Sequence, residues 1–282
     1  MNLRLAVHLH MYYWEMWQEI KKYLRNLEDY PYDLFVTMNE RNAAIEQDIK
    51  RVHANTVFFE VENRGYDVGP FVYFLHQIDL EKYDLILKIH TKNNKSGPCG
   101  VINGRWMSRK YWFMLLIEAL IGSKSIFNRN IKAFNQDAYL GMIGSKYLIT
   151  SSCTKTVRDG VIENMERLKI SNYLPIRFVA GTMFMVRSEI MQEIKNNYNI
   201  DDFLPSDEQK KNENLAHVLE RLFGTLTKAL GYKICGFDRN KEFEVIGVLG
   251  HWWHFVYQKK ITKRNYMQIK VLKLPIYRKK IA

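Results

Sequence analysis

The chain has 282 residues, of which 47% are hydrophobic and 13% aromatic, so it can bury a sizeable core and is not a disordered protein. Its formal net charge is +12, which favours anionic partners. Its three cysteines, Cys99, Cys153 and Cys235, form no CxxC pair, which argues against a disulfide framework or a cysteine zinc site and favours a reducing compartment.

Strand and helix patterns alternate along the first half of the chain. Residues 3–12, "LRLAVHLHMY", alternate in polarity and predict a strand, and apolar residues at helical spacing predict a helix over 16–27. The helix predicted for "VGPFVYFLHQI" has Pro70 in its first turn, where the missing N–H costs nothing. The further elements of this half are strand 32–39, helix 42–52, strand 55–63, helix 68–78, strand 83–91 and helix 105–123.

The second half predicts a strand over 140–147, a strand running into a helix over 176–194, and an amphipathic helix over 213–230. Strands that alternate with helices predict an α/β fold of Rossmann type, with a mostly parallel sheet covered by helices on both faces. No linker or internal repeat is evident. We therefore expect one domain over residues 1–245, followed by an extension over residues 246–282.

Several common catalytic motifs are missing from the sequence. It contains no GxxxxGK[ST], no GxGxxG after the first strand, no GxSxG and no HExxH. The stretch "HWWH" places His251 and His254 three residues apart between tryptophans, a pattern that favours packing over metal ligation. A nucleotide-binding P-loop, a dinucleotide fingerprint and a zinc protease site are therefore not indicated.

Polar residues gather where the predicted strands end. Open α/β sheets bind their ligands at the carboxyl ends of the strands, so these residues form a candidate binding site. Asp67 suits a sugar or ribose hydroxyl, and Arg64, His90 and Lys92 suit a phosphate. The candidate ligand-binding residues are His8, His10, Thr37, Asn63, Arg64, Asp67, His90, Thr91 and Lys92.

A plainer interpretation of this region remains open. Asp67 stands directly before the predicted helix 68–78, where an aspartate commonly caps the first turn. In this interpretation, Gly65 and Gly69 have no role in binding and merely permit a tight turn.

Six blocks, in this order, resemble the rhamnan synthesis protein F family of bacterial polysaccharide glycosyltransferases: "VHLHMYY", "YDLFVTMN", "NRGYDVGPF", "LILKIHTK", "FVAGTMFMVR" and "HVLERLFG". They extend from about residue 5 to 235. The resemblance implies a GT-A-like domain that moves a sugar, often L-rhamnose, from a dTDP- or UDP-sugar donor to a growing glycan. It also makes the candidate ligand-binding residues candidate donor-binding residues, and we expect transfer with inversion.

In GT-A enzymes the fourth strand usually ends in Asp-x-Asp, which holds a divalent cation against the donor diphosphate. The corresponding strand here ends in His90, Thr91 and Lys92, without a carboxylate. We therefore expect no metal ligand on this strand and assign charge neutralisation to Lys92 with His90 and Arg64. Weak binding of magnesium or manganese through Asp67 remains an alternative.

The resemblance also implies a general base near the start of a late helix. His217 and Glu220 are candidates on the helix 213–230, and Asp207 and Glu208 are rivals that precede it. Ala180, Gly181, Thr182 and Arg221 are expected to line the donor sugar or the acceptor. As alternatives, the residues on helix 213–230 form an ordinary solvated helix face, and "AGT" (Ala180 to Thr182) forms a tight turn between a strand and a helix.

The end of the sequence is strongly basic. No acidic residue follows Glu244, whereas nine lysines and arginines do. Such a segment suits an anionic membrane surface, although a merely solvated tail is also possible. With no signal peptide evident and no apolar run of ~20 residues, we expect a cytoplasmic protein at the inner face of the membrane that binds no nucleic acid. A non-catalytic scaffold and a nucleic-acid-binding protein are the competing functions.

Overall fold

The computed structural model describes residues 3–92, 98–102, 105–170, 175–205, 208, 214–238, 256–261, 266–272 and 274–280. The chain divides into two compact units. The first comprises Met1–Asn94 and Phe113–Asp238, and the second comprises Lys95–Trp112 and Arg239–Ala282. The division into a domain over residues 1–245 and an extension over 246–282 stays a prediction.

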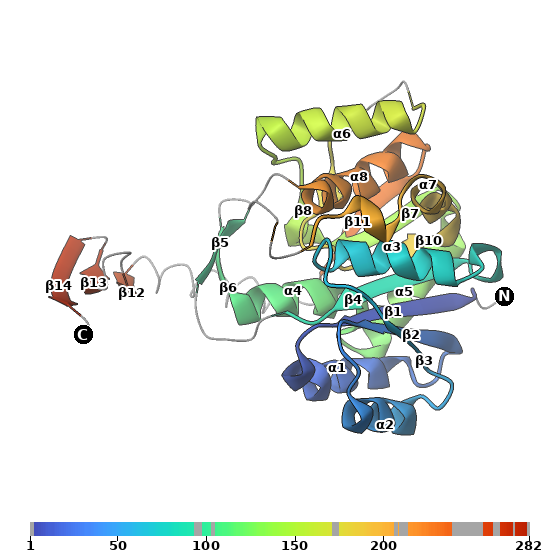
Figure 1. Cartoon of the computed structure of the whole chain (residues 1–282), viewed down its shortest axis with the longest axis horizontal. Helices are drawn as coiled ribbons and strands as arrows, with labels where there is room; N and C mark the ends of the chain where they lie inside the picture. Colours follow the sequence, from blue (N-terminus) through green and yellow to red (C-terminus); the bar gives the residue numbers. More distant parts are fainter. Residues whose placement is uncertain are drawn as a thin grey trace. The chain divides into compact units, whose positions relative to one another are not determined.

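The first unit is built on a central sheet. Its strands are β1 (Leu5–Met11), β2 (Tyr32–Met38), β3 (Val57–Glu60), β4 (Leu85–His90), β7 (Leu140–Ser145), β10 (Phe184–Arg187) and β11 (Lys233–Phe237). Within the described residues they form a seven-stranded sheet in the order β11-β7-β10-β4-β1-β2-β3 (Figure 1). All neighbours pair in parallel except β10, which runs antiparallel to β4 and β7. The predicted α/β fold with a mostly parallel sheet is confirmed.

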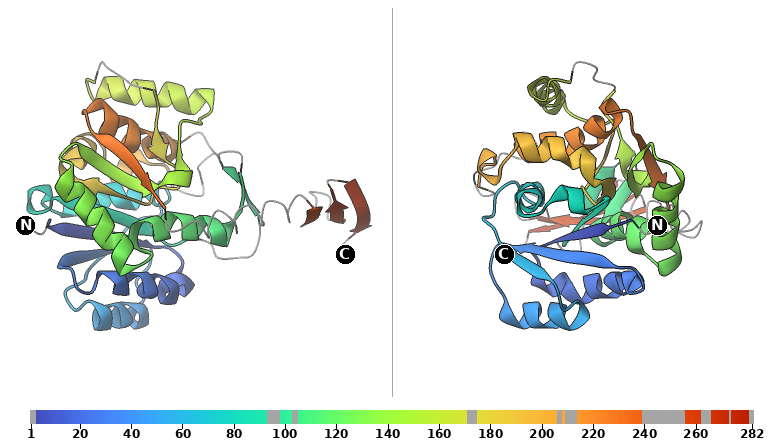
Figure 2. Two further views of the ribbon diagram at one scale, coloured as in Figure 1. Left: turned by 180° about the vertical axis from the view of Figure 1, so that it is seen from behind. Right: turned by 90° about the vertical axis from the view of Figure 1, so that its right-hand side faces the viewer.

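Helices cover both faces of this sheet. They are α1 (Trp17–Leu24), α2 (Ala43–Val52), α3 (Val68–Gln77), α4 (Arg109–Ile121), α5 (Lys124–Gln136), α6 (Lys155–Arg167), α7 (Gln192–Asn197) and α8 (Leu215–Ala229). α1 and α2 lie on one side of the sheet, and α3, α7 and α8 lie on the other (Figures 1 and 2). Several helices begin at a side chain that accepts a hydrogen bond from a backbone N–H of the first turn, a common start signal. These caps are Asn42, Ser123, Thr154 and Asn214.

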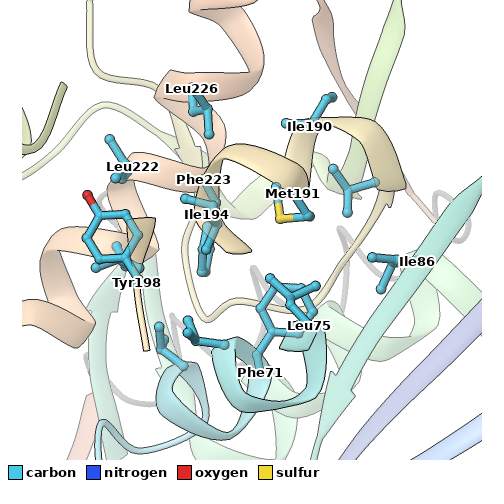
Figure 3. Packing of buried hydrophobic residues seen from close by; sticks show 14 of the residues in the cluster. Phe71, Leu75, Ile86, Ile190, Met191, Ile194, Tyr198, Leu222, Phe223 and Leu226 are labelled. Atoms are coloured by element: carbon cyan, nitrogen blue, oxygen red, sulfur yellow. The ribbon is translucent and has the colours of Figure 1, made fainter. Parts of the chain in front are cut away.

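The core on the α3 side joins α3 and α8 to the sheet. Phe71 of α3 and Phe223 of α8 are fully or almost fully buried, with ring centroids 5.7 Å apart (Figure 3). α8 also lies unusually close to the strand β9 (Phe178–Val179), which pairs with β8 (Ile149–Thr150). A Cβ on Gly224 would lie 2.3 Å from the carbonyl oxygen of Arg177, so only glycine permits this approach. The close packing fixes the position of α8 relative to the turn after β9.

Two predicted elements differ from the structure. The helix predicted for 105–123 begins only at Arg109, because residues 105–108 form β6 (Arg105–Ser108), which pairs with β5 (Pro98–Ile102). The strand predicted within 176–194 is two short strands, β9 and β10, separated by a turn in which Gly181 and Thr182 have positive φ. Pairing with the neighbouring strand β5 in a local hairpin decided the first case, and left-handed turn residues decided the second.

A separate antiparallel sheet is formed by β12 (Tyr257–Ile261), β13 (Tyr266–Val271) and β14 (Leu274–Lys280) in the second unit. Its strand order is β12-β13-β14, so β14 is an edge strand. Of the helices in the described ranges, none is both long and apolar enough to cross a membrane.

Candidate active site

A row of polar side chains crosses the face of the sheet that packs against α3. The register pairs His8 with Lys88, His10 with His90, and His10 with Thr37. Directly paired residues project to the same face, and so do residues two positions apart on a strand. The buried polar row therefore consists of His8, His10, Thr37, Lys88 and His90, all of them buried.

Lys88 is the most unusual member of the buried polar row, because its side chain is 0% exposed. Its Nζ donates to Asp67 Oδ2 at 2.6 Å and to the carbonyl oxygen of Thr182 at 3.0 Å. The Thr182 hydroxyl also donates to Asp67 Oδ2. Lys88 thus connects the start of α3 to the turn between β9 and β10.

Asp67 is the N-cap residue of α3, but its side chain makes no capping hydrogen bond. The capping interpretation is therefore wrong for the side chain, which instead forms the buried ion pair. Lys88 and Thr182 both donate to Oδ2 of this carboxylate, and the side chain keeps 20% exposure.

The electrostatics of this pair are set by burial and by the surrounding cations. Burial alone would raise the pKa of Asp67, but the charges of Lys88 and Lys92 and the hydrogen bond from Lys88 hold it well below its usual range. Burial lowers the pKa of the Lys88 amine, although Asp67 opposes that shift. Because Asp67 stays ionised, a buried counter-charge stabilises it, and the ammonium form of Lys88 supplies that charge.

His8 and His10 share one hydroxyl group. Thr37 Oγ1 lies 2.9 Å from His8 Nε2 and 3.1 Å from His10 Nδ1. Burial lowers the pKa of His8 well below its ordinary value and lowers the pKa of His10 to about 4. Both rings are therefore neutral near pH 7. His8 also stacks on Phe74 at 4.6 Å, which places it beneath the site and not at its surface.

The end of β4 supplies the other predicted residues. His90 Nδ1 lies 3.4 Å from Asp67 Oδ2, yet burial lowers the pKa of His90 well below its ordinary value, so this ring is neutral too. Thr91 Oγ1 accepts hydrogen bonds from the backbone N–H groups of Tyr12 and Tyr13, both at 3.0 Å. Thr91 thus holds the chain that follows β1. Lys92 is half-buried and close enough to influence Asp67 electrostatically.

The turn between β9 and β10 is held from two sides. Glu220 Oε1 on α8 accepts a hydrogen bond of 2.6 Å from the backbone N–H of Gly181. Gly181 and Thr182 both have positive φ, at 89° and 56°, and for threonine this conformation is uncommon. The contacts of Glu220 and Lys88 with this turn stabilise it. Ala180 donates its N–H to the carbonyl oxygen of Leu148 at 2.8 Å.

The geometry of α8 fixes the tautomer of His217. Asn214 Oδ1 accepts the backbone N–H of His217 at 3.1 Å as the cap of α8, which fixes the orientation of the amide. The same oxygen lies 2.7 Å from His217 Nδ1. Because an amide oxygen only accepts, Nδ1 must carry the hydrogen and Nε2 the lone pair. Burial lowers the pKa of His217, so the ring is neutral and can accept a proton at Nε2.

Other predicted residues take supporting or outer positions. Arg64 pairs with Glu62 and donates to the carbonyl oxygen of Phe203 at 3.1 Å, so it holds the segment near residue 203. Asn63 is exposed. Arg221 pairs with Glu220 and lies over the Phe178 ring at 4.6 Å. Asp207, His251 and His254 lie outside the described residues, whereas Glu208 lies in a turn and is exposed.

Two residues of the site were not identified from the sequence. Lys88 lies inside the apolar run "LILKIH" of a strand that is buried along its whole length. A lysine at such a position needs a buried partner, and this could have identified Lys88 from the sequence. Tyr66 is 38% exposed, has a φ of 56°, and packs edge-on against His217 at 5.8 Å. An exposed aromatic ring beside polar groups suits stacking on a base or sugar.

The available side chains do not fit a tightly held divalent cation. In the described parts of the chain, no three His, Cys, Asp or Glu side chains are grouped as metal ligands. Asp67 is the carboxylate beside the end of β4, and its Oδ2 already accepts hydrogen bonds from Lys88 and Thr182. Metal-independent activity stays a prediction.

Two curated relatives are both described as "Uncharacterized protein WxcX", from Xanthomonas campestris pv. campestris strains B100 and ATCC 33913. Each is 23% identical over 184 residues, covering 61% of this chain and 24% of the relative. The chain thus spans about a quarter of the length of these relatives.

Among solved structures, S. aureus TarS residues 1–349 matches with a TM-score of 0.40 and 13% identity, covering 80% of this chain and 56% of TarS. The same protein in complex with UDP gives a TM-score of 0.41 and 12% identity, covering 78% and 56%. Scores this low carry no argument about this chain. The model of the family described as "Rhamnan synthesis protein F" matches residues 1–232. This chain belongs to the rhamnan synthesis protein F family.

Proposed function

We propose that this protein is a glycosyltransferase that moves a hexose, such as L-rhamnose, from a dTDP- or UDP-sugar to a growing cell-surface polysaccharide. The observation that carries the proposal is the convergence of charged and polar groups from four elements at one edge of the sheet. Asp67 comes from α3, Lys88 and His90 from β4, Thr182 from the turn after β9, and Glu220 from α8. Family membership supports the same function.

The donor is proposed to lie over the accessible residues, with the buried polar row beneath it. Asp67 Oδ1 would accept a hydroxyl of the ribose or sugar, in a charge-assisted hydrogen bond. Tyr66 would stack on the base, and Lys92 would neutralise the diphosphate. The buried residues beneath the donor would hold the accessible ones in place without touching it. They are His8, His10, Thr37, His90 and Thr91.

His217 is proposed as the general base. Its Nε2 would take the proton of the acceptor hydroxyl while that oxygen attacks the anomeric carbon. The bond from the anomeric carbon to the diphosphate breaks, and the diphosphate departs with the electron pair. Attack opposite the leaving group inverts the anomeric centre. Asp207 is the rival base from the sequence.

Glu220 suits a positioning role better than a proton-accepting role. Its two oxygens already accept from Gly181 and Arg221, so a further proton would break one of these contacts. The carboxylate instead holds the turn of Ala180, Gly181 and Thr182, which is proposed to line the sugar or the acceptor. Arg221 fixes Glu220 in this position.

The proposal is tested by incubating the full chain with a panel of dTDP- and UDP-sugars and a lipid-linked glycan acceptor. Transfer should add one sugar mass to the acceptor and release an equal amount of nucleoside diphosphate. His217→Gln should abolish most of this signal, and His53→Gln, at the end of α2, is the matched control. A chain that binds no donor in this panel and transfers none of the sugars is not such an enzyme.

A further inference from the structure

The three-stranded sheet of the second unit has two chemically different faces. Tyr257 pairs with Val271, and Val271 pairs with Leu274, so these three residues share one face. Ile269 pairs with Tyr277 and lies two positions from Val271, which places this pair on the same face. The apolar face therefore carries Tyr257, Met267, Ile269, Val271, Leu274 and Tyr277, together with Lys279.

The opposite face carries charge. Lys270 pairs with Pro275, and Arg278 and Lys280 alternate with the residues of the apolar face along β14. The strand register shifts between Ile269 and Lys270, and Ile276 is the extra residue of this β-bulge. The bulge explains why Leu274 and Tyr277 lie on the same face although they are three positions apart. The three-stranded sheet is thus amphipathic: one face is mainly apolar and also carries Lys279, and the other carries Lys270, Arg278 and Lys280.

The apolar side chains of β14 are open to solvent, whereas Met267, Ile269 and Val271 are partly buried. Leu274 is 68% exposed and Ile276 is 63% exposed, and every residue of the edge strand β14 is exposed. A fully exposed edge strand that carries large aliphatic residues is costly in water and a liability for aggregation. Such a surface indicates a partner.

Charge selects the partner. No acidic residue follows Glu244, while nine lysines and arginines do, so the sheet complements an anionic surface. A second copy paired through β14 would lay two strands side by side that each carry Arg278, Lys279 and Lys280 and no acidic residue, which disfavours it. Nucleic acid would leave Leu274 and Ile276 in water.

We propose that the apolar face of the β12–β14 sheet docks on an anionic lipid bilayer. Leu274 and Tyr277 enter the boundary between headgroups and acyl chains, as the apolar side of an interfacial element does. Lys279 lies on the same face, and the edge position of β14 lets Arg278 and Lys280 extend along their aliphatic stems to the headgroups. This docking goes beyond the proposed transferase activity and does not depend on it.

The test is sedimentation of the full chain with vesicles of phosphatidylglycerol and phosphatidylcholine, compared with phosphatidylcholine alone. The expected result is binding only to the anionic vesicles, with weakening at high salt. Leu274→Asp with Tyr277→Asp should lower the partition coefficient at least tenfold. Lys279→Gln should lower it about fivefold. Tyr139→Asp, at an exposed aromatic of the first unit, is the matched control and should change nothing.

Three results would overturn the proposal. One is equal binding to both kinds of vesicle or to neither. Another is capture of an oligonucleotide with no vesicle binding, and the third is a concentration-dependent dimer in place of vesicle binding. Because no step requires turnover, a negative result here leaves the proposed transferase activity standing.

Discussion

The ion pair between Asp67 and Lys88 gives the sharpest prediction about the site, because its two halves differ in exposure. Lys88 is 0% exposed, whereas Asp67 keeps 20%. Asp67→Asn leaves a buried ammonium without its counter-charge. Lys88→Met leaves a carboxylate that still reaches solvent and still accepts from the Thr182 hydroxyl. The two single substitutions should therefore cost unequal amounts of folding free energy.

Breaking a buried pair by removing one partner typically costs about 3–5 kcal/mol, whereas replacing both partners by groups of similar size costs much less. We expect Asp67→Asn to reach about 3 kcal/mol or more, which is a large part of the ~5–15 kcal/mol that stabilises a typical domain. Lys88→Met should cost less. The double substitution should be more stable than Asp67→Asn alone, since no unpaired buried charge remains.

Urea unfolding at pH 7.5 measures these free energies, with the slope of each transition checked for two-state behaviour. Glu19→Gln, which removes the exposed ion pair with Lys22, is the control and should change the midpoint little. The reasoning is refuted if the two single effects simply add in the double variant to within about 0.5 kcal/mol. It also fails if Lys88→Met is the more damaging single change.

Four further predictions follow from the same geometry. The pKa of His10 is about 4 in the folded protein against an ordinary 6.5, so stability present in full above pH 6.5 is lost as the pH falls toward 4. Between pH 7.5 and 5.5 this ring contributes about 1.3 kcal/mol to the loss in urea unfolding, beside the losses from His8 and His90, and His10→Gln should remove that share; an unchanged pH dependence would show that this ring is not responsible. His217→Gln should lower kcat by about 10²–10⁴-fold with little change in KM, and should remove the acidic limb of the kcat profile; a retained limb would assign it to another base. Gly224→Ala should cost about 1–3 kcal/mol in thermal unfolding and lower turnover, because α8 must move away from the turn that Glu220 holds; full activity would argue against that role. Turnover should survive EDTA, and Lys92→Ala should lower it more than Lys92→Arg; loss in EDTA with recovery in manganese would contradict the metal-free account.

The fold could largely be predicted from the sequence, because its elements are locally encoded. The strand "LILKIH" and the helix "VGPFVYFLHQ" lie within their predicted ranges. What periodicity could not show was partner choice. β6 pairs with β5 through contacts outside its own four residues, and the turn at Gly181 and Thr182 depends on contacts from α8 and β4.

The site could be predicted only at the level of location. The sequence places Asp67 at the start of a helix and His90 at the end of a strand, two ends that are expected to meet. In the structure, His90 Nδ1 lies 3.4 Å from Asp67 Oδ2. It could not show that Asp67 is already paired, because its partner Lys88 comes from the middle of a buried strand. Nor could it show that Thr91 binds backbone amides, since that contact joins segments 79 residues apart.

The central claim is that a nucleoside-diphosphate donor binds at the carboxyl edge of the sheet beside Asp67. The most direct measurement is photo-crosslinking of the full chain with azido-uridine diphosphate and azido-thymidine diphosphate, followed by peptide mapping. The account predicts crosslinks within residues 60–70, 88–92 or 214–221, which unlabelled dTDP- or UDP-sugar suppresses. Crosslinks confined to other segments, with the same suppression by donor, would contradict it.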